Sequence, residues 1–332
     1  MWGMPHEDEA LRQGLRELTT TDPVRALVAQ DARRARREYP LTVLAGPMFG
    51  VAEELGADWR VITLGEATPQ CSRDDLAGHL RMEARAAAEP EPYLAAARVL
   101  DWERHDELAV AGRRFRIIRV EQLLRLNLDG EPEPPRPTDP DPRTPPVPRY
   151  EVLAAPRHEM QDPPGREDPA EAEAAELAVR FAEAVDLPGT DGELVRADAL
   201  RAELSHPVPV PMIPVFSVAE YLHDGWRSAT AACPTPQRAR EALAEYLQQV
   251  APVVERVDER TRSAYDEAAG RLLAGRLDEL AVCGRRFRIV RVEKAARFGE
   301  DGPEPPRPSD FDPDPPVEVL ALRLRAEGII ED

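Results

Sequence analysis

The feature that most constrains the fold of this chain is an internal repeat. The segment DELAVAGRRFRIIRVE, residues 106–121, returns as DELAVCGRRFRIVRVE at residues 278–293, and fourteen of the sixteen positions are identical. Self-similarity of this strength indicates that one structural unit occurs twice. A chain of 332 residues is long enough for two such units, each with a hydrophobic core of its own.

The repeat extends over most of the chain. At a spacing of 167 residues, PMFGVAEELGADWR (47–60) matches PVFSVAEYLHDGWR (214–227), and EVLA at 151–154 matches EVLA at 318–321. The doubled phrase itself is spaced by 172 residues, so the second copy carries five extra residues in the helical stretch before it. Matches that keep one order, with only length changes between them, predict two tandem homologous copies of one domain.

The two copies meet near residues 158–168, in the proline-rich segment QDPPGREDP. Proline interrupts both helices and strands, so this segment is a natural boundary. We predict a first copy at residues 1–157 and a second at 158–332, with an acidic helical linker at about 168–187. Two copies of one fold favour a pseudo-two-fold arrangement.

Each copy has the sequence pattern of an α+β domain, in which an antiparallel sheet of two hairpins plus a closing strand is covered by helices. In the first copy the spacing predicts helices at residues 24–38, at 68–105 with a break at Glu89-Pro90, and at 120–126. It predicts strands at residues 49–54 paired with 59–64, at 107–110 paired with 113–118, and at 150–154. Glu53 and Arg60, which return as Glu220 and Arg227, are predicted to form cross-strand ion pairs.

The doubled strand is the first candidate site. Phe115 and Ile117 alternate with Arg114 and Arg116, so we expect one apolar face and one outward face that carries two guanidinium groups. Such a face either pairs with nearby carboxylates or binds an anion, because the planar guanidinium fork suits carboxylate and phosphate. The candidate ligand-binding residues are Arg114, Arg116, Arg286 and Arg288.

Two proline-rich acidic loops, residues 131–148 and 303–316, follow the doubled strands. Such sequences favour the polyproline II conformation, and they act either as stiff spacers or as ligands for a partner's aromatic groove. The alternating aspartates of Asp310 to Asp314 lack the glycine and the distal glutamate of a calcium loop. We therefore assign no metal to this segment.

Composition excludes several classes of function. The net charge of −19 opposes binding to nucleic acid or to an anionic membrane, although it allows basic partners. The sequence shows neither an apolar signal region nor a run of about 18 apolar residues, and three scattered cysteines do not make a disulfide framework. We expect a soluble, cytoplasmic protein, and the sequence sets no oligomeric state.

Catalytic motifs are missing from the sequence. The six histidines show no metal-binding spacing, and the nucleophile elbow, the phosphate-binding loop and the dinucleotide turn do not occur. Arginine supplies 42 of the 43 basic residues, so Lys294 alone could form a Schiff base, and its counterpart in the first copy is Gln122. We therefore assign no catalytic residue, no cofactor and no metal.

The order of motifs resembles one known family. VAE…WR, a helical segment, EL-V-G-R-F-R-I-V-R and then EPPRP-[TS]-D resemble a family of uncharacterised actinobacterial proteins, classified as a domain of unknown function. The resemblance covers nearly the whole chain. It implies a cytoplasmic actinobacterial origin, and it implies no activity.

The sequence favours a non-catalytic interaction or ligand-binding protein over an enzyme. The arginine-bearing strands and the proline-rich loops would bind a protein partner or a small anionic ligand. The alternative is an enzyme that acts on a small anionic substrate, with Asp or Glu as acid and base and arginine as a clamp. A deep pocket in which carboxylates converge with Arg114 or Arg286 would favour the enzyme.

Overall fold

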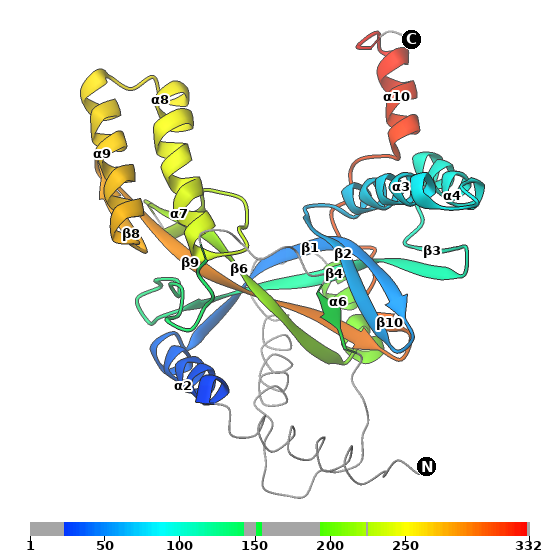
Figure 1. The fold of residues 1–332 in the computed structure, drawn as a ribbon, viewed down its shortest axis with the longest axis horizontal. Helices are drawn as coiled ribbons and strands as arrows, with labels where there is room; N and C mark the ends of the chain where they lie inside the picture. Colours follow the sequence, from blue (N-terminus) through cyan, green and yellow to red (C-terminus); the bar gives the residue numbers. More distant parts are fainter. Residues whose placement is uncertain (1–22, 143–150, 155–192, 224, 331–332) are drawn as a thin grey trace, which may run out of the picture. The chain divides into compact units, whose positions relative to one another are not determined.

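A computed structural model describes residues 23–142, 151–154, 193–223 and 225–330 (Figure 1). The described strands form a large open antiparallel sheet in the order β5-β2-β1-β4-β9-β6-β7, accompanied by helices. Three shorter strands join it, because β3 pairs with β4, while β8 and β10 pair with β9. The predicted combination of an antiparallel sheet with helices is confirmed at this level.

The first helices and strands are α2 (Pro23–Glu38), β1 (Leu41–Leu55), β2 (Asp58–Glu66), α3 (Pro69–Ala86), α4 (Glu91–Trp102), β3 (Glu107–Val110), β4 (Arg113–Leu126) and β5 (Val152–Leu153). After residue 192 follow α6 (Glu193–Ser205), β6 (Val208–Leu222), β7 (Gly225–Ser228), α7 (Pro236–Glu245), the π-helix η1 (Tyr246–Val250), α8 (Ala251–Val254) and α9 (Glu259–Gly275). The remaining elements are β8 (Glu279–Val282), β9 (Arg285–Gly299), β10 (Gly302–Pro303) and α10 (Val317–Ala326).

The chain divides into two compact units, each assembled from separate stretches of sequence. Unit 1 consists of Met1–Leu41, Arg125–Arg143 and Phe216–Arg291. Unit 2 consists of Thr42–Leu124, Thr144–Val215 and Val292–Asp332. Both units therefore contain residues from before and after the predicted boundary at residue 158. The two predicted copies are a different division of the chain and stay a prediction, and the predicted linker lies outside the described residues.

In unit 2 the hairpin of β1 and β2 has the predicted register, with Glu53 opposite Arg60, and the two side chains form an ion pair. Thr68 caps α3 by accepting from the backbone N–H of Cys71, and Pro69 follows at the first helical position. Helices α3 and α4 cover one apolar cluster of the sheet. Its largest buried members are Leu76, Leu80, Leu100, Phe115 and Ile117. A second cluster gathers Trp59, Ile118, Leu153, Met212 and Phe298.

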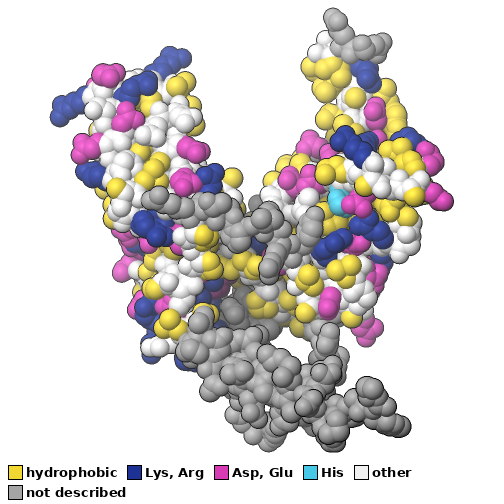
Figure 2. Space-filling view, viewed as in Figure 1, with side chains coloured by type: hydrophobic (Ala, Val, Ile, Leu, Met, Phe, Trp, Pro, Cys, Tyr) yellow, Lys and Arg dark blue, Asp and Glu magenta, His cyan; other side chains and the backbone are white. Residues whose placement is uncertain are grey.

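In unit 1 the helices α7, η1, α8 and α9 supply the apolar partners of β6, β8 and β9. Thr235 caps α7 as Thr68 caps α3, by accepting from a backbone N–H three residues on. The core contains Phe216, Leu243, Tyr265 and Phe287, each at most 2 % exposed. On the face seen in Figure 2, basic and acidic side chains are scattered among uncharged ones on these helices, as expected for a solvated surface.

Two sequence predictions of local structure are wrong. Residues 120–126 were expected to be helical, yet β4 continues through them, and Val120 to Leu124 pair with Ala296 to Val292 of β9. One face of residues 121–126 is buried and the other is half-buried, and both carry apolar residues, so the sequence lacks the polar–apolar alternation that marks a half-exposed strand. The second EVLA segment, Glu318–Ala321, lies in α10, whereas the first forms β5 against β2.

In the part of the chain that the structure describes, no helix combines the length and the apolar character needed to cross a membrane.

Candidate functional site

Arg116, one of the four predicted ligand-binding residues, is buried within unit 2 and only 3 % exposed. Its guanidinium pairs with Glu107 at 2.7 Å and with Asp301 at 2.8 Å, and it donates to the carbonyl oxygen of Pro303 at 3.0 Å. The ring of Trp59 lies 5.2 Å from the guanidinium carbon. The N–H groups of Arg116 thus donate to acceptors of the protein itself.

Arg288 has the same surroundings within unit 1 and is 6 % exposed. It pairs with Glu279 and, at 2.5 Å, with Glu131, and it donates to the carbonyl oxygen of Pro132 at 2.9 Å. Trp226 stacks 5.4 Å from its guanidinium carbon. The prediction that these arginines point outward is therefore wrong for both buried residues. Arg116 on β4 is covered by residues that follow β9, and Arg288 on β9 is covered by residues that follow β4.

Arg114 and Arg286 lie nearer the surface. Arg114 pairs with Glu107 at 2.7 Å, and Arg286 pairs with Glu131 at 2.7 Å. Glu107 therefore pairs with both arginines of β4, and Glu131 pairs with both arginines of β9. Hydrogen bonds from Arg114 lower the pKa of Glu107 despite partial burial, and those from Arg286 do the same for Glu131. Ligand binding by the four arginines stays a prediction.

The proline-rich loops extend the sheet by backbone pairing with the doubled strands. In unit 2 the backbone N–H of Arg119 donates to Glu304 at 2.8 Å, and that of Glu304 donates to Arg297 at 2.8 Å. In unit 1 the backbone N–H of Arg291 donates to Glu133 at 2.9 Å. The two sequence features that were expected to bind a partner are thus bound to each other.

An aspartate in each loop binds the first turn of a helix. Asp312 accepts from the backbone N–H of Gln70 at 2.9 Å and from the buried guanidinium of Arg73 at 2.7 Å. In unit 1 Asp141 binds the first turn of α7 and pairs with Arg240 at 2.7 Å. Carboxylates are stabilised at these positions by the free N–H groups and by the helix dipole. We call these two contacts the aspartate latches.

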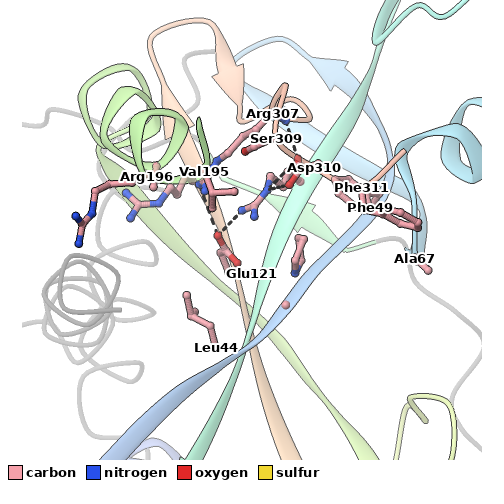
Figure 3. A pocket seen from close by; sticks show the side chains of 15 residues that line it. Leu44, Phe49, Ala67, Glu121, Val195, Arg196, Arg307, Ser309, Asp310 and Phe311 are labelled. Atoms are coloured by element: carbon pink, nitrogen blue, oxygen red, sulfur yellow. Dashed lines mark hydrogen bonds and ion pairs between the residues drawn. The ribbon is translucent and has the colours of Figure 1, made fainter. Parts of the chain in front are cut away.

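A pocket of about 430 Å³ opens in unit 2, where β1, β4, α6 and the second proline-rich loop meet (Figure 3). Its apolar walls are Leu44, Pro47, Phe49, Val195, Ala199 and Phe311. Phe311 is 75 % exposed, although its ring lies beside Phe49 in Figure 3. An exposed aromatic ring at the mouth of a pocket gives an incoming apolar group a surface to pack on.

The floor of the pocket is charged. Arg119, Arg297 and Arg307 line it together with Glu121 and Asp310. Arg119 pairs with Glu121 and, at 3.0 Å, with Asp310, while Arg307 lies 3.6 Å from Glu121. In Figure 3, Glu121, Asp310 and Arg307 lie together at the centre of the site. Arg119 thus pairs with both lining carboxylates, whereas Arg307 pairs more closely with Glu304, at 2.5 Å, which is not part of the lining.

Burial and charge act against each other on this floor. Burial alone would raise the pKa of Glu121, but Arg119 and Arg307 hold it below its ordinary value. Burial lowers the pKa of Arg297, and the carboxylate of Glu304 opposes that shift. A carboxylate with a lowered pKa is a weak base. Glu121 is therefore better suited to hold the guanidinium groups of Arg119 and Arg307 in place than to accept a proton.

Sequence reasoning missed the pocket residues, although two of them lie in the doubled phrase. Arg119 and Glu121 end that phrase, and their alternation places both on the face of β4 that carries Phe115 and Ile117. The sequence signal that could have pointed to these two residues is the Arg-Val-Glu ending of the phrase, which is identical in both copies. The rest of the floor comes from residues far away in the sequence, and no local pattern marks them.

Among the described residues, no group of three or more His, Cys, Asp or Glu side chains could hold a metal ion. Lys294 is 6 % exposed, burial lowers its pKa, and its Nζ lies 3.8 Å from Glu151. It does not line the pocket. The only ε-amino group of the chain is therefore placed in the sheet rather than at the candidate site.

Fold and site together define a mixed α/β protein with a charged, aromatic-walled pocket. A model of a family of unknown function, DUF5954, matches residues 22–313, so the chain belongs to that family. The predicted resemblance to a domain-of-unknown-function family is confirmed in this respect. Comparison with curated proteins and comparison with solved structures each gave no match.

Proposed function

We propose that this protein is a non-catalytic, cytoplasmic binding protein whose pocket takes a small organic anion with an apolar body. The observation that carries the proposal is the combination of a pocket of about 430 Å³ with an arginine-rich floor and aromatic walls. This volume suits a small molecule, and pockets of this kind use a few polar groups to orient an otherwise apolar ligand.

The charge of the site supports an anionic ligand. Four arginines, Arg119, Arg196, Arg297 and Arg307, and two carboxylates line the pocket, in a chain whose net charge is −19. An incoming carboxylate or phosphate can share the fork-shaped donors of Arg119 or Arg297. The apolar part of the ligand would then pack against Phe49 and Phe311.

The lowered pKa of Glu121 weighs against the alternative of acid–base catalysis, because a general base works best with a pKa near the working pH. Arg114 and Arg286, which would have supported the enzyme, are absent from the pocket lining.

We also propose that the chain arose by duplication and that its copies are arranged with pseudo-two-fold symmetry. Supporting this, contacts recur at equivalent positions: Arg116 with Arg288, Arg119 with Arg291, and the latch of Asp312 with that of Asp141. Only the first member of each pair belongs to unit 2.

Ligand binding is tested with medium-chain and aromatic carboxylates, each compared with its neutral amide. We expect calorimetry to detect carboxylate binding and little amide binding. Phe311→Ala should weaken binding about tenfold, because it removes an exposed aromatic contact worth about 1–2 kcal/mol without touching the core. Leu128→Ala, at a residue that is 80 % exposed and outside the pocket, is the matched control.

Two further variants separate shape from charge. Ala199→Trp fills the pocket and should abolish binding, whereas Arg297→Met should remove the preference for the carboxylate over the amide. Arg125→Met, at a residue buried in unit 1 and absent from the pocket lining, controls for the loss of a buried arginine. Equal binding of carboxylate and amide to the unmodified protein would refute an anion site.

A further inference from the structure

We infer that the two halves of the chain, residues 1–157 and 158–332, are each other's binding partners, and that the pocket exists only when both are present. This inference concerns assembly, and it holds whatever ligand the pocket takes. Three sets of contacts, each lying within a single unit, carry it.

The first set consists of the aspartate latches and the loops that bear them. In unit 1, Asp141 from the first half reaches Arg240 from the second half, a side chain that is 5 % exposed. In unit 2, Asp312 from the second half reaches Arg73 from the first half, which is equally buried. Each of these arginines also pairs with a carboxylate of its own half, Arg73 with Asp106 at 2.7 Å and Arg240 with Asp278 at 2.6 Å. Separating the halves would therefore remove one of the two ion pairs of each buried guanidinium, which costs stability because the charge stays buried with fewer partners.

The second set is the shared apolar cluster of unit 2. Trp59 and Leu153 come from the first half, and Met212 and Phe298 come from the second. All four side chains are at most 7 % exposed, so separating the halves would open this cluster to water. The strand pair of β4 with β9 joins the same halves along Val120 to Leu124.

The third set is the pocket itself. Phe49, Arg119 and Glu121 belong to the first half, whereas Arg297 and Phe311 belong to the second. Neither half alone contains both the aromatic pair and the charged floor. A molecule that binds in the pocket therefore contacts both halves and stabilises their association by mass action.

The test uses the whole chain with a protease site inserted near residue 160 and cut after purification. Native mass spectrometry and size-exclusion chromatography should show one complex that contains both fragments, with unchanged circular dichroism. Fragments that separate at micromolar concentration without denaturant would overturn the inference.

The latches supply the matched variants. In the cut protein, Asp141→Asn together with Asp312→Asn should raise the dissociation constant of the fragments about tenfold or more. Asp314→Asn, two residues from a latch, should leave the dissociation constant unchanged. If the double variant and the control have equal dissociation constants, the aspartate latches do not hold the halves together, and that part of the inference is wrong.

Phe298→Leu, a milder change in the shared cluster, gives a second test if the double variant does not fold. In the cut protein it should raise the dissociation constant of the fragments. The corresponding loss of association free energy should be larger than the loss in the free energy of unfolding of the uncut chain. Absence of anion binding to an intact cut complex would refute only the proposed function. Loss of the complex would refute the inference drawn from assembly.

Discussion

At the residue scale, the main feature is how arginine is used. Arg116 and Arg288 lie on the strand face that alternation assigns to solvent, yet both are buried against carboxylates, backbone carbonyls and a tryptophan ring. Arginine can be buried in this way because its guanidinium is planar, weakly hydrated and able to donate in several directions at once. A lysine at either position could not make the same set of contacts.

Replacing Arg116 by methionine should therefore lower the free energy of unfolding by about 2 kcal/mol, because two carboxylates and one carbonyl lose a donor. Chemical denaturation with urea measures the change. Arg98→Met, which removes an exposed partner of Glu91, should cost at most about 0.5 kcal/mol and serves as the control. Equal losses for the two variants would mean that the buried pairs add no more than a surface pair.

At the element scale, the hairpin of β3 and β4 has a two-residue turn that is poorly matched to its sequence. Ala111 and Gly112 have φ angles of 51° and 78°, and Cys283 and Gly284 repeat them at 48° and 78°. Turns of this kind need positive φ at both positions, which glycine and asparagine adopt more readily than alanine or cysteine. The hairpin is thus formed despite its first turn residue.

Ala111→Asn should raise the free energy of unfolding by about 0.5–1 kcal/mol, because asparagine tolerates the left-handed region better than alanine does. Cys283→Asn should act in the same direction in the other hairpin. Gly112→Ala should lower stability, since no neighbouring atom lies within 4 Å of the added carbon and only the backbone strain remains. Thermal unfolding of the three variants measures their order of stability. A stabilising effect of Gly112→Ala would contradict the argument.

The element scale also shows what could be predicted. The two hairpins and the start of α3 follow from alternation, from the Ala-Gly turn and from the Thr-Pro cap, all of which are local signals. The strand character of residues 120–126 could not be found this way, because Val120, Leu123 and Leu124 are apolar on both faces of a buried strand and mimic helical spacing. Tertiary pairing with β9 decides their conformation.

At the scale of the whole molecule, a second limit on prediction is distance along the chain. The pocket joins Arg119 to Asp310, and the latch joins Arg73 to Asp312, across about two thirds of the sequence. The residue types were visible in the sequence, but their pairing was not. A surplus of acidic residues creates many chance partners for every arginine, and only the fold selects among them.

These paired carboxylates predict how the molecule responds to acid. Arginine contacts lower the pKa values of Glu53, Glu107, Glu131, Asp141 and Asp301 below their ordinary values, even though burial opposes the shift. A group whose pKa is lower in the folded state stabilises the protein above its unfolded pKa and loses that effect as pH falls through its folded pKa. Stability should therefore fall progressively below the ordinary glutamate pKa of 4.5.

Urea denaturation at a series of pH values measures this slope. Glu107→Gln should be less stable than the unmodified protein at pH 7, and the difference should shrink in acid, where Glu107 itself becomes protonated. A difference that stays constant with pH would show that the side-chain volume of Glu107, rather than its charge, contributes to stability.

The buried position of Lys294 has a practical consequence. Because it carries the only ε-amino group of the chain and lies 6 % exposed on β9, amine-reactive reagents should leave the side chains of the folded protein unmodified. Opening of the strand pair between β4 and β9 would expose that amine. The rate at which residue 294 acquires a covalent label would then measure how often β4 and β9 separate in the folded protein.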